Sequence, residues 1–348
     1  MSQVGWRTAM EWALYGPDGF YTRGERPSAH FRTSVHASRR FAQAMARLIA
    51  EMDDALGHPA RFDLVDVGAG SGELLAEILS LTETAALDDL SRRLRPIAVE
   101  VSPRPAGLSP AIEWHDRLPD SITGLVIANE WLDNVPLDVV ELTGDGPRLV
   151  VVDPGSGAEL PGPVPSAEDT DWLERWWPLS EAGDRAEVGR HRCTAWASVI
   201  ERLRGGMALA IDYAHELGRR PVYGTLTGYR DGRCVSPVPD GSCDITAHVA
   251  LDACADAGEY AGATGTLLTT QRAALRALGL HGTRPPLEQA RTDPHGYLRA
   301  LRAAGEDAEL IDREGLGGFG WLVQTVGVEV PRVLTATSRR EATPDRAG

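Results

Sequence analysis

The sequence predicts an α/β fold: a mostly parallel sheet covered by helices on both faces. Apolar segments of strand length alternate with segments whose apolar residues recur at helical spacing. Several of the apolar segments end in an acid or an amide, as strands do at the ligand-binding edge of an open sheet. With 348 residues, 43% of them hydrophobic and 24% charged, the chain has ordinary globular composition and suits one large domain or two small ones.

The first half of the chain contains two predicted helices and four predicted strands. Residues 34–57 form the first helix, because Phe41, Met45, Leu48 and Met52 share one face and Gly57 suits a helix stop. The other helix is predicted at 72–81, and the strands at 62–67, 95–101, 111–116 and 124–130.

The second half combines a hairpin, helices and two further strands. The hairpin joins residues 136–142 to 148–153 through Gly144-Asp145-Gly146 and is followed by a surface loop at 153–165. A helix at 191–206 directs Trp196, Val199, Ile200 and Leu203 inward and is stopped by two glycines. The remaining predictions are strands at 207–213 and 319–327, an irregular segment at 214–243, and helices at 246–257 and 270–278.

We divide the chain into three parts. Residues 1–58 are an N-terminal helical cap, and residues 59–335 are the main domain, with insertions at 136–190 and 214–245. The polar residues 336–348 are predicted to be a disordered tail.

Composition excludes several classes of function. The net charge of −15 does not favour nucleic-acid binding. The chain has no lysine, so neither a pyridoxal-phosphate Schiff base nor a Walker-type phosphate loop can form. Neither the four cysteines nor the nine histidines show a metal-site spacing, so no metal is expected. We expect no membrane span and a cytoplasmic location; the oligomeric state stays open.

The segment "DVGAGSG" (66–72) places a glycine-rich turn between a predicted strand and a predicted helix. Such a turn lets a ligand touch backbone amides at the helix N-terminus. The dinucleotide fingerprint Gly-x-Gly-x-x-Gly fails here, because its third glycine would fall on a glutamate or a leucine. The pattern that fits is acid-x-Gly-x-Gly-x-Gly, formed by Asp66, Gly68, Gly70 and Gly72. It resembles the first motif of class I S-adenosylmethionine methyltransferases; the alternative is a purely structural tight turn.

Polar residues at the ends of the next strands strengthen this interpretation. Glu100 ends the second strand, where a carboxylate accepts both ribose hydroxyls, and Asp116 after the third strand is placed to face the adenine. Asn129 and Glu130 end the fourth strand. Neighbouring strand residues point to opposite faces, so the strand must break at this pair if both enter the site. The alternative for each acid is a surface position at a strand end.

Several motifs, in the same order along the chain, resemble the MidA family, which includes the mitochondrial complex I assembly methyltransferase. "ANEWLDNVPLDVVEL" resembles the family's "NE-x-x-DalPv" motif, and "YGPDGFYTRG" its N-terminal "Y-x-P-x-GYY". "GGMALAIDYA", "GTLTGYRDGR" and "DITAHV" resemble "GG-x-L-x-IDYG", "GTL-x-xY" and "DITAHVDF". The matches cover residues 15 to about 327.

The resemblance implies a class I methyltransferase with a Rossmann-like, mostly parallel seven-stranded sheet and S-adenosylmethionine as its cofactor. By analogy with the mitochondrial member, the acceptor is an arginine of a protein, such as a respiratory-complex subunit. Thr33 lies in an N-terminal segment that resembles the family's and is expected to close over the cofactor. His30 replaces the family's aspartate in that segment, which puts the substrate in question.

A guanidinium acceptor needs carboxylates that orient it and take its proton late. Glu130, Asp133 and Asp212 are the candidates, with Tyr213 shaping the pocket and Asn129 contacting the cofactor. Asp133 is alternatively a helix cap, and Tyr213 a packing residue.

Two other functions stay open. The first is a small-molecule O- or N-methyltransferase of secondary metabolism, whose acceptor pocket would be formed by the irregular segment 214–243. The second is a non-catalytic assembly factor that retains the cofactor as a structural ligand.

Overall fold

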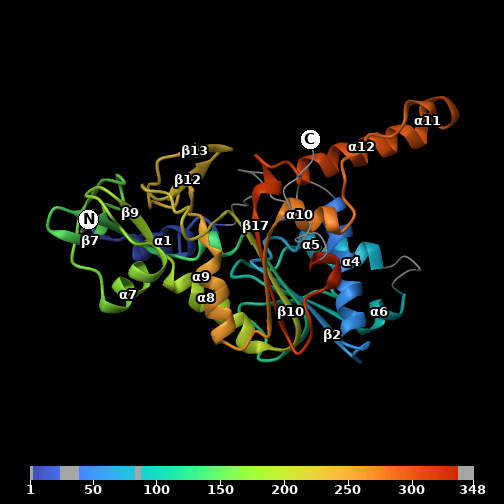
Figure 1. Cartoon of the computed structure of the whole chain (residues 1–348), viewed down its shortest axis with the longest axis horizontal. Helices are drawn as coiled ribbons and strands as arrows, with labels where there is room; N and C mark the ends of the chain where they lie inside the picture. The colour runs from blue at the N-terminus through green and yellow to red at the C-terminus, as the bar shows by residue number, and fades with distance from the viewer. Residues whose placement is uncertain (1–2, 24–38, 83–87, 336–348) are drawn as a thin grey trace, which may run out of the picture.

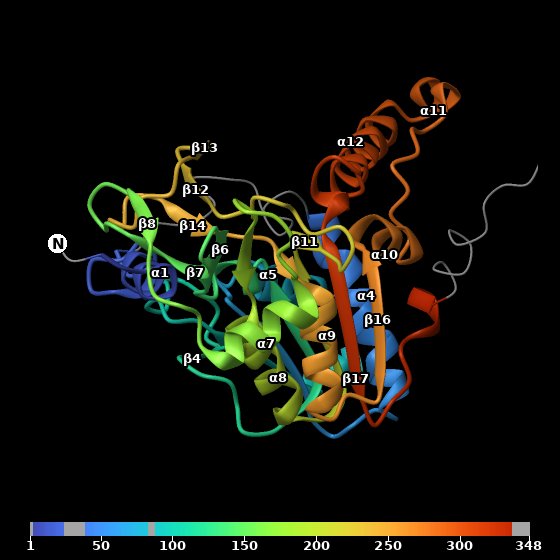
Figure 2. The same ribbon diagram turned by 60° about the vertical axis from the view of Figure 1, so that its left-hand side comes forward.

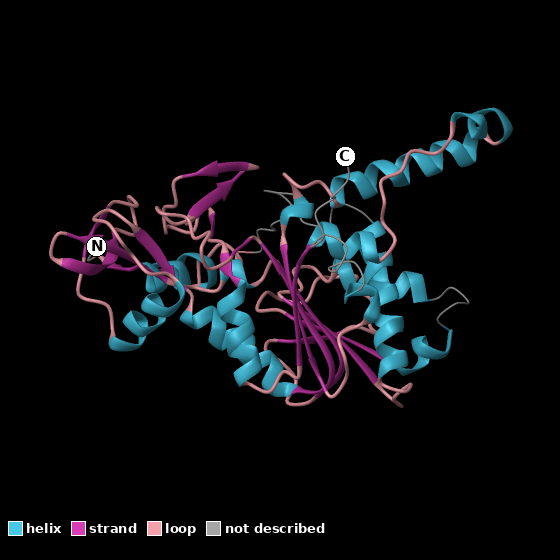
Figure 3. Cartoon of the chain, in the orientation of Figure 1, coloured by secondary structure: helices cyan, strands magenta, loops and turns pink. Residues whose placement is uncertain are grey.

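The computed structural model describes residues 3–23, 39–82 and 88–335. The chain forms a mixed seven-stranded sheet with helices on both faces, and a smaller sheet beside it (Figures 1 and 3). The α/β class predicted from the sequence is confirmed.

The large sheet has a parallel part and an antiparallel edge. Its strand order is β16 (Gly265–Thr270), β17 (Gly320–Val326), β10 (Leu203–Asp212), β5 (Ile122–Asn129), β2 (Phe62–Val67), β3 (Leu94–Val99) and β4 (Glu113–His115). Neighbouring strands from β10 to β4 are parallel, whereas β17 is antiparallel to both β10 and β16. The sheet is therefore mixed: β17 runs opposite to the other six strands, which share one direction. Neither strand β16 nor the direction of β17 was predicted from the sequence.

Helices cover the two faces of this sheet (Figure 1). On one face α4 (Arg39–Ala55), α5 (Glu73–Thr82) and α10 (Gln271–Ala277) contribute Phe41, Leu75 and Leu275 to a core that includes Leu64 of β2. On the other face α8 (Arg190–Arg202) and α9 (Leu251–Tyr260) pack against alternate residues such as Val65. The near-continuous burial of β2, β5 and β10 matches their apolar sequences.

The smaller sheet holds the N-terminal helix. Its order is β1 (Val4–Gly5), β7 (Gly146–Val152), β6 (Asp138–Thr143) and β9 (Arg185–Val188), with β8 (Glu159–Pro161) on β7. The predicted hairpin is confirmed as β6 and β7. Helix α1 (Trp6–Tyr15) packs its buried face here, in a core separate from that of α4. The two helices of the predicted N-terminal cap thus pack in different places.

Short elements fill the segments predicted to be irregular. A three-stranded sheet orders β13 (Arg233–Val235), β12 (Thr227–Arg230) and β14 (Asp244–Thr246), and β11 (Ala214–His215) pairs with β15 (Val249–Ala250). Helices α11 (Leu287–Thr292) and α12 (Pro294–Leu310) project from the body (Figure 2). They were not predicted, and neither was α7 (Ala167–Trp176) or α6 (Asp88–Arg93). None of the helices in the described ranges is long and apolar enough to cross a membrane.

Three predicted boundaries were wrong. The loop at 153–165 contains strand β8, and the helix predicted from residue 246 begins at Leu251, after two short strands. Helix α8 ends at Arg202, and β10 begins at the next residue, so Gly205 and Gly206 lie inside the strand and do not stop the helix.

Gly206 is required where β10 and β5 approach each other. Its φ is +124°, and a Cβ added to it would lie 2.0 Å from the carbonyl oxygen of Gly124 in β5. Gly205 has no such constraint: its Cβ would lie 3.5 Å from Leu56, an ordinary contact. The pairing of the two strands therefore requires a glycine at position 206 but not at position 205.

We expect Gly206→Ala to lower the free energy of unfolding by about 2–4 kcal/mol, because it adds backbone strain and a clash. Gly205→Ala is the matched control and should change it by less than about 1 kcal/mol. Urea denaturation of both variants measures the difference. Equal stabilities would contradict the close approach of the two strands.

Candidate active site

The glycine-rich turn begins where β2 ends. Gly68, Gly70 and Gly72 have φ values of +71°, +57° and +80°, which residues with a Cβ adopt only with strain. The amide of Gly68 donates to the carbonyl of Val99 at 2.9 Å, which ties the turn to the end of β3. The next element is α5, so the turn lies at the N-terminus of a helix, as predicted.

The carboxylate of Glu100 lies across this turn. One of its oxygens accepts from the amide of Gly70 at 3.0 Å, and the other accepts from the amide of Ser102 at 2.9 Å. A carboxylate oxygen has two lone pairs, so each keeps one for a ligand hydroxyl. This geometry suits the predicted contact with a ribose.

Asp66 is 4% exposed and adds a second acid at the turn. Burial, followed by the charges of Glu100 and Glu73, raises its pKa to about 8. Three carboxylates around one turn favour a cationic ligand and disfavour a pyrophosphate. S-adenosylmethionine carries an ammonium and a sulfonium, so these residues fit it.

Strand β5 ends as the sequence predicted, with a break between its last two site residues. Glu130 has φ +52°, and its amide donates to the carbonyl of Ile211 in β10 at 2.8 Å. The side-chain amide of Asn129 donates to a carboxylate oxygen of Glu130 at 3.0 Å. Both side chains are half-buried and lie together at the carboxyl end of the sheet.

Asp212 caps the short helix η2 (Leu132–Asn134) that follows. It is fully buried, and one of its oxygens accepts from the amides of Leu132 and Asp133 at 3.0 and 3.2 Å. The helix-capping role considered for Asp133 thus belongs to Asp212. Burial, then the neighbouring charge of Asp133, raises the pKa of Asp212.

Asp133 faces the other way, toward β14. One of its carboxylate oxygens accepts from the hydroxyl of Thr246 at 2.7 Å, and the other is buried with no hydrogen-bond partner in the described structure. Burial raises the pKa of Asp133 above its ordinary value. Its backbone carbonyl accepts from the guanidinium of Arg192, which is 1% exposed.

Tyr213 follows β10 and forms one wall beside these acids. Its ring stacks on His248 with centroids 5.3 Å apart and packs against Phe319 at 4.2 Å. Burial, then the charge of Glu130, raises its pKa. The phenol therefore stays protonated near Glu130.

Asp116 does not join the group: its side chain is 76% exposed and pairs with Arg117 at 3.2 Å. Thr33 and His30 lie outside the described residues.

Sequence reasoning missed Asp244, which belongs to β14. One of its oxygens accepts from the hydroxyl of Tyr21 at 3.0 Å and from the side-chain amide of Asn134 at 2.9 Å. Burial, then the charge of Asp133, raises the pKa of Asp244 to about 7. Its segment "DITAHV" carried a family resemblance, but no property of the sequence alone places this acid beside Asp133.

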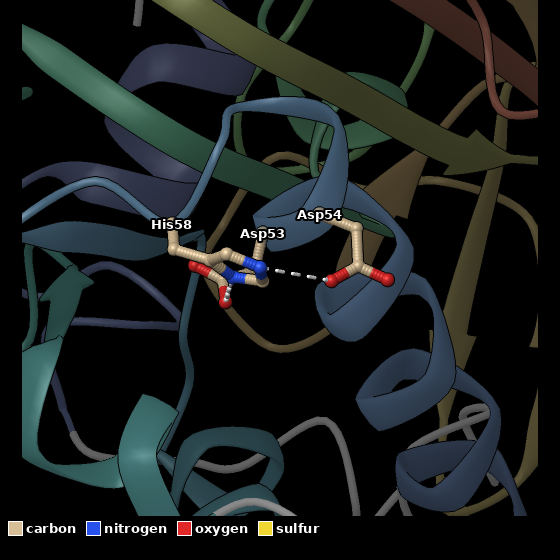
Figure 4. Close-up of side chains that lie close together, drawn as sticks. All are labelled: Asp53, Asp54 and His58. Carbon is tan, nitrogen blue, oxygen red and sulfur yellow. Dashed lines mark hydrogen bonds and ion pairs between the residues drawn. The ribbon is translucent and has the colours of Figure 1, made fainter.

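A separate group of acids lies at the opposite end of β2, around Asp53, Asp54 and His58 (Figure 4). Within the described ranges it is close enough to hold a metal ion. Both oxygens of Asp53, however, accept from the guanidinium of Arg93 at 2.8 Å, and one also contacts His58 at 2.9 Å. This group is a structural ion-pair network that joins α4 to α6.

The chain matches the model of a family described as S-adenosyl-L-methionine-dependent methyltransferases over residues 44–268. It is 26% identical over 275 residues to the mitochondrial protein arginine methyltransferase NDUFAF7 of Xenopus tropicalis, covering 66% of this chain and 61% of that protein. The Caenorhabditis elegans homologue is 24% identical over 290 residues, covering 70% and 64%. The chain thus spans less than two thirds of the length of these relatives.

A crystal structure from Burkholderia thailandensis, bound to S-adenosyl-homocysteine, is similar to this chain with a TM-score of 0.78 and 28% identity, covering 96% of this chain and 90% of that one. A native structure from the same organism gives a TM-score of 0.76 and 28% identity, covering 95% and 90%. These findings identify S-adenosylmethionine as the cofactor, in agreement with the three carboxylates at the glycine-rich turn.

We expect Gly70→Val to fold and to lose S-adenosylhomocysteine binding, because a branched side chain would enter the ligand's path. Its Cβ would meet nothing in the protein closer than 3.8 Å, so folding should lose only about 1–2 kcal/mol from the left-handed backbone. Gly57→Val is the control, since Gly57 has φ +70° and open space around it. Calorimetry measures the affinity for S-adenosylhomocysteine. If Gly70→Val binds it as tightly as the wild type, the glycine-rich turn does not contact the cofactor.

Asp66 should make cofactor binding depend on pH. In the free protein the carboxyl is mostly protonated below its pKa of about 8, and a bound cation favours the ionised form. Affinity for S-adenosylhomocysteine should therefore rise from pH 6.5 to 7.5, by up to about tenfold for one released proton. Titration calorimetry in buffers with different ionisation enthalpies measures how many protons are released when the ligand binds. Asp66→Asn should abolish the slope, and a flat wild-type profile would contradict the assignment.

Proposed function

The chain belongs to the family of S-adenosyl-L-methionine-dependent methyltransferases, and we propose that it methylates arginine side chains of an acceptor protein. The acceptor is inferred from two sources. The relatives in Xenopus tropicalis and Caenorhabditis elegans are named protein arginine methyltransferases. The acids at the carboxyl ends of β5 and β10 provide the charge that a guanidinium requires.

The observation that carries the proposal is the position of Glu130. Its backbone leaves the strand in a left-handed conformation, with the side chain half-buried beside Asn129. A non-glycine residue with positive φ is uncommon and often marks a functional position. The charge of Glu130 also raises the pKa of both Tyr213 and Asp212, so it lies near both.

S-adenosylmethionine, when bound, supplies an electrophilic methyl group on a positively charged sulfur. The residues of the chain then have two tasks, which are positioning and proton acceptance. Glu100 and the glycine-rich turn hold the adenosine end, and Glu130 orients the acceptor nitrogen. A guanidinium has a pKa above about 12, so its proton leaves late, toward a carboxylate. Burial raises the proton affinity of Asp212 and Asp133, which favours this transfer.

Transfer of a radiolabelled methyl group to a host lysate tests the proposal. A labelled protein band that yields methylarginine on hydrolysis supports it. Label in the small-molecule fraction would instead support a small-molecule methyltransferase, and no label in either fraction would support a non-catalytic cofactor-binding protein. A labelled band whose methyl group sits on another amino acid would contradict arginine as the acceptor.

Glu130→Gln should slow methyl transfer while leaving cofactor affinity nearly unchanged. The change keeps the shape and removes a charge that orients a cation, which costs about 2–5 kcal/mol of transition-state stabilisation. Single-turnover rates at saturating cofactor measure the loss. Glu141→Gln, at a half-buried position paired in register with β9, is the control and should react at the wild-type rate. Equal rates for Glu130→Gln would assign this residue a structural role.

A further inference from the structure

Four tyrosines from distant parts of the chain surround the buried acids of the candidate site. We call them the tyrosine ring; its members are Tyr15, Tyr21, Tyr213 and Tyr229. They belong to the end of α1, the segment after it, the end of β10 and strand β12. All four are half-buried, whereas the acids between them are buried.

Several contacts fix the ring in place. The rings of Tyr15 and Tyr21 stack with centroids 5.6 Å apart, and the hydroxyl of Tyr15 donates to the carbonyl of Asn134 at 3.2 Å. The hydroxyl of Tyr21 donates to Asp244. Tyr229 is paired in register with Asp244 across β12 and β14. The negative charge of Asp133 raises the pKa of every member of the ring.

Three carboxylate oxygens of the buried acids have no hydrogen-bond partner in the described structure. They belong to Asp133, Asp212 and Asp244, residues that are 5%, 0% and 0% exposed. A buried acceptor without a donor is costly, more so when it carries charge. The other oxygen of each carboxylate is already held by neighbours, so the unpartnered oxygens are fixed in position.

Among the described residues, negative charge exceeds positive charge at this place. Asp133, Asp212 and Asp244 lie in one cluster, and the buried cation Arg192 lies beside Asp133 and Asp212. The hydrogen bonds of Arg192 go to backbone carbonyls, among them those of Val135 and Ala247. Within the described ranges the buried acids outnumber this one buried cation, so the cluster must take up either protons or a further cation.

We propose that Asp133 and Asp244, inside the tyrosine ring, bind the guanidinium of the methyl acceptor. This inference rests on the proposed function and extends it from Glu130 to a second set of residues. A guanidinium is planar, offers five donors and stacks on aromatic faces, so it satisfies both the unpartnered oxygens and the rings. A neutral hydroxyl would leave the charge of the cluster unbalanced.

The binding test uses two peptides and needs no methyl transfer. Acetyl-Gly-Arg-Gly-amide carries the guanidinium, and acetyl-Gly-citrulline-Gly-amide is its neutral isostere. With S-adenosylhomocysteine bound, the wild-type protein should bind the arginine peptide at least tenfold more tightly than the citrulline peptide. Equal affinities for the two peptides would overturn the proposal.

Asp244→Asn should remove this preference. Asparagine keeps the oxygen that accepts from Tyr21 and Asn134 but has no charge. Arginine-peptide affinity should fall at least tenfold, while affinity for S-adenosylhomocysteine should change less than twofold. A folded variant with wild-type preference for arginine would contradict the role of Asp244.

Thermal stability separates a binding role from a structural one. At pH 8 without peptide, Asp244→Asn should melt at or above the wild-type temperature, because it removes a buried charge that no cation of the described residues neutralises. Asp63→Asn is the matched control: Asp63 is 0% exposed, accepts from the amide of Thr123 and pairs with Arg61 at 3.2 Å. It should melt lower and retain the peptide preference. A large loss of stability in Asp244→Asn would favour a structural role for this acid.

Tyr229→Leu and Tyr229→Phe provide a second, independent pair. The leucine variant removes one aromatic face and should weaken arginine-peptide binding three- to tenfold, whereas phenylalanine keeps the face and should bind within twofold of wild type. Equal arginine-peptide affinities of the two variants would exclude a contact between the guanidinium and the tyrosine ring.

The transfer assay and the peptide-binding assay fail independently. If the methyl group is found on an amino acid other than arginine, the proposed function is wrong. Peptide binding is measured without methyl transfer, so it tests the role of Asp133 and Asp244 separately.

Discussion

The buried guanidinium of Arg192 holds together the two loops that carry the acceptor side of the site. It projects from α8 and donates to carbonyls on both loops, at Asp133 and Val135 after β5 and at Ala247 and His248 before α9. A buried cation that loses its partners is strongly destabilising, so each loop is held where these bonds place it. The positions of the acids on both loops therefore depend on how α8 packs under the large sheet.

Among the described residues, acids predominate both at the cofactor turn and on the acceptor side of the site. The proposed reaction gives a physical reason for this excess of negative charge. The cofactor and a guanidinium acceptor are both cations, and two unit charges 4 Å apart repel by about 4 kcal/mol at an effective dielectric constant of 20. Acids on each side offset that repulsion: Asp66 and Glu100 at the cofactor turn, and Asp133 and Asp244 at the acceptor side. Glu130 adds its charge near Asp212 and Tyr213.

The parts of the site that the sequence predicted are those that depend on local patterns. The glycine-rich turn, Glu100 and the break at Glu130 follow from strand periodicity and from what glycine permits, and the structure places them together. The missed residues depend on contacts across long separations. Asp244 meets Asn134 across 110 positions, and Arg192 in the helix sequence looked like any charged surface residue.

Several helix and strand boundaries were also predicted wrongly because they depend on contacts between residues far apart in the sequence. Two adjacent glycines after a helix usually stop it. Here, however, Gly206 lies within a strand, and a glycine is required there because the carbonyl of Gly124 on the neighbouring strand leaves no room for a Cβ. A helix-capping role was considered for Asp133 alone, whereas Asp212 caps η2. Its carboxylate reaches the amides of Leu132 and Asp133 only because β10 lies beside β5. Strand β16 has no signal of its own beyond a short apolar run, and it is defined by pairing with β17.

The smaller sheet bears on the active site through α1. That helix carries Tyr15, and it is fixed at its start by the pairing of β1 with β7 and by hydrogen bonds from Trp6 to Glu159 and from Arg7 to Asp138. The helix also contacts β14, where Asp244 lies. The insertion at 136–190 thus sets the position of two aromatic walls although it supplies neither of them. The cofactor turn, by contrast, is built on β2 and β3, through the hydrogen bond from Gly68 to Val99.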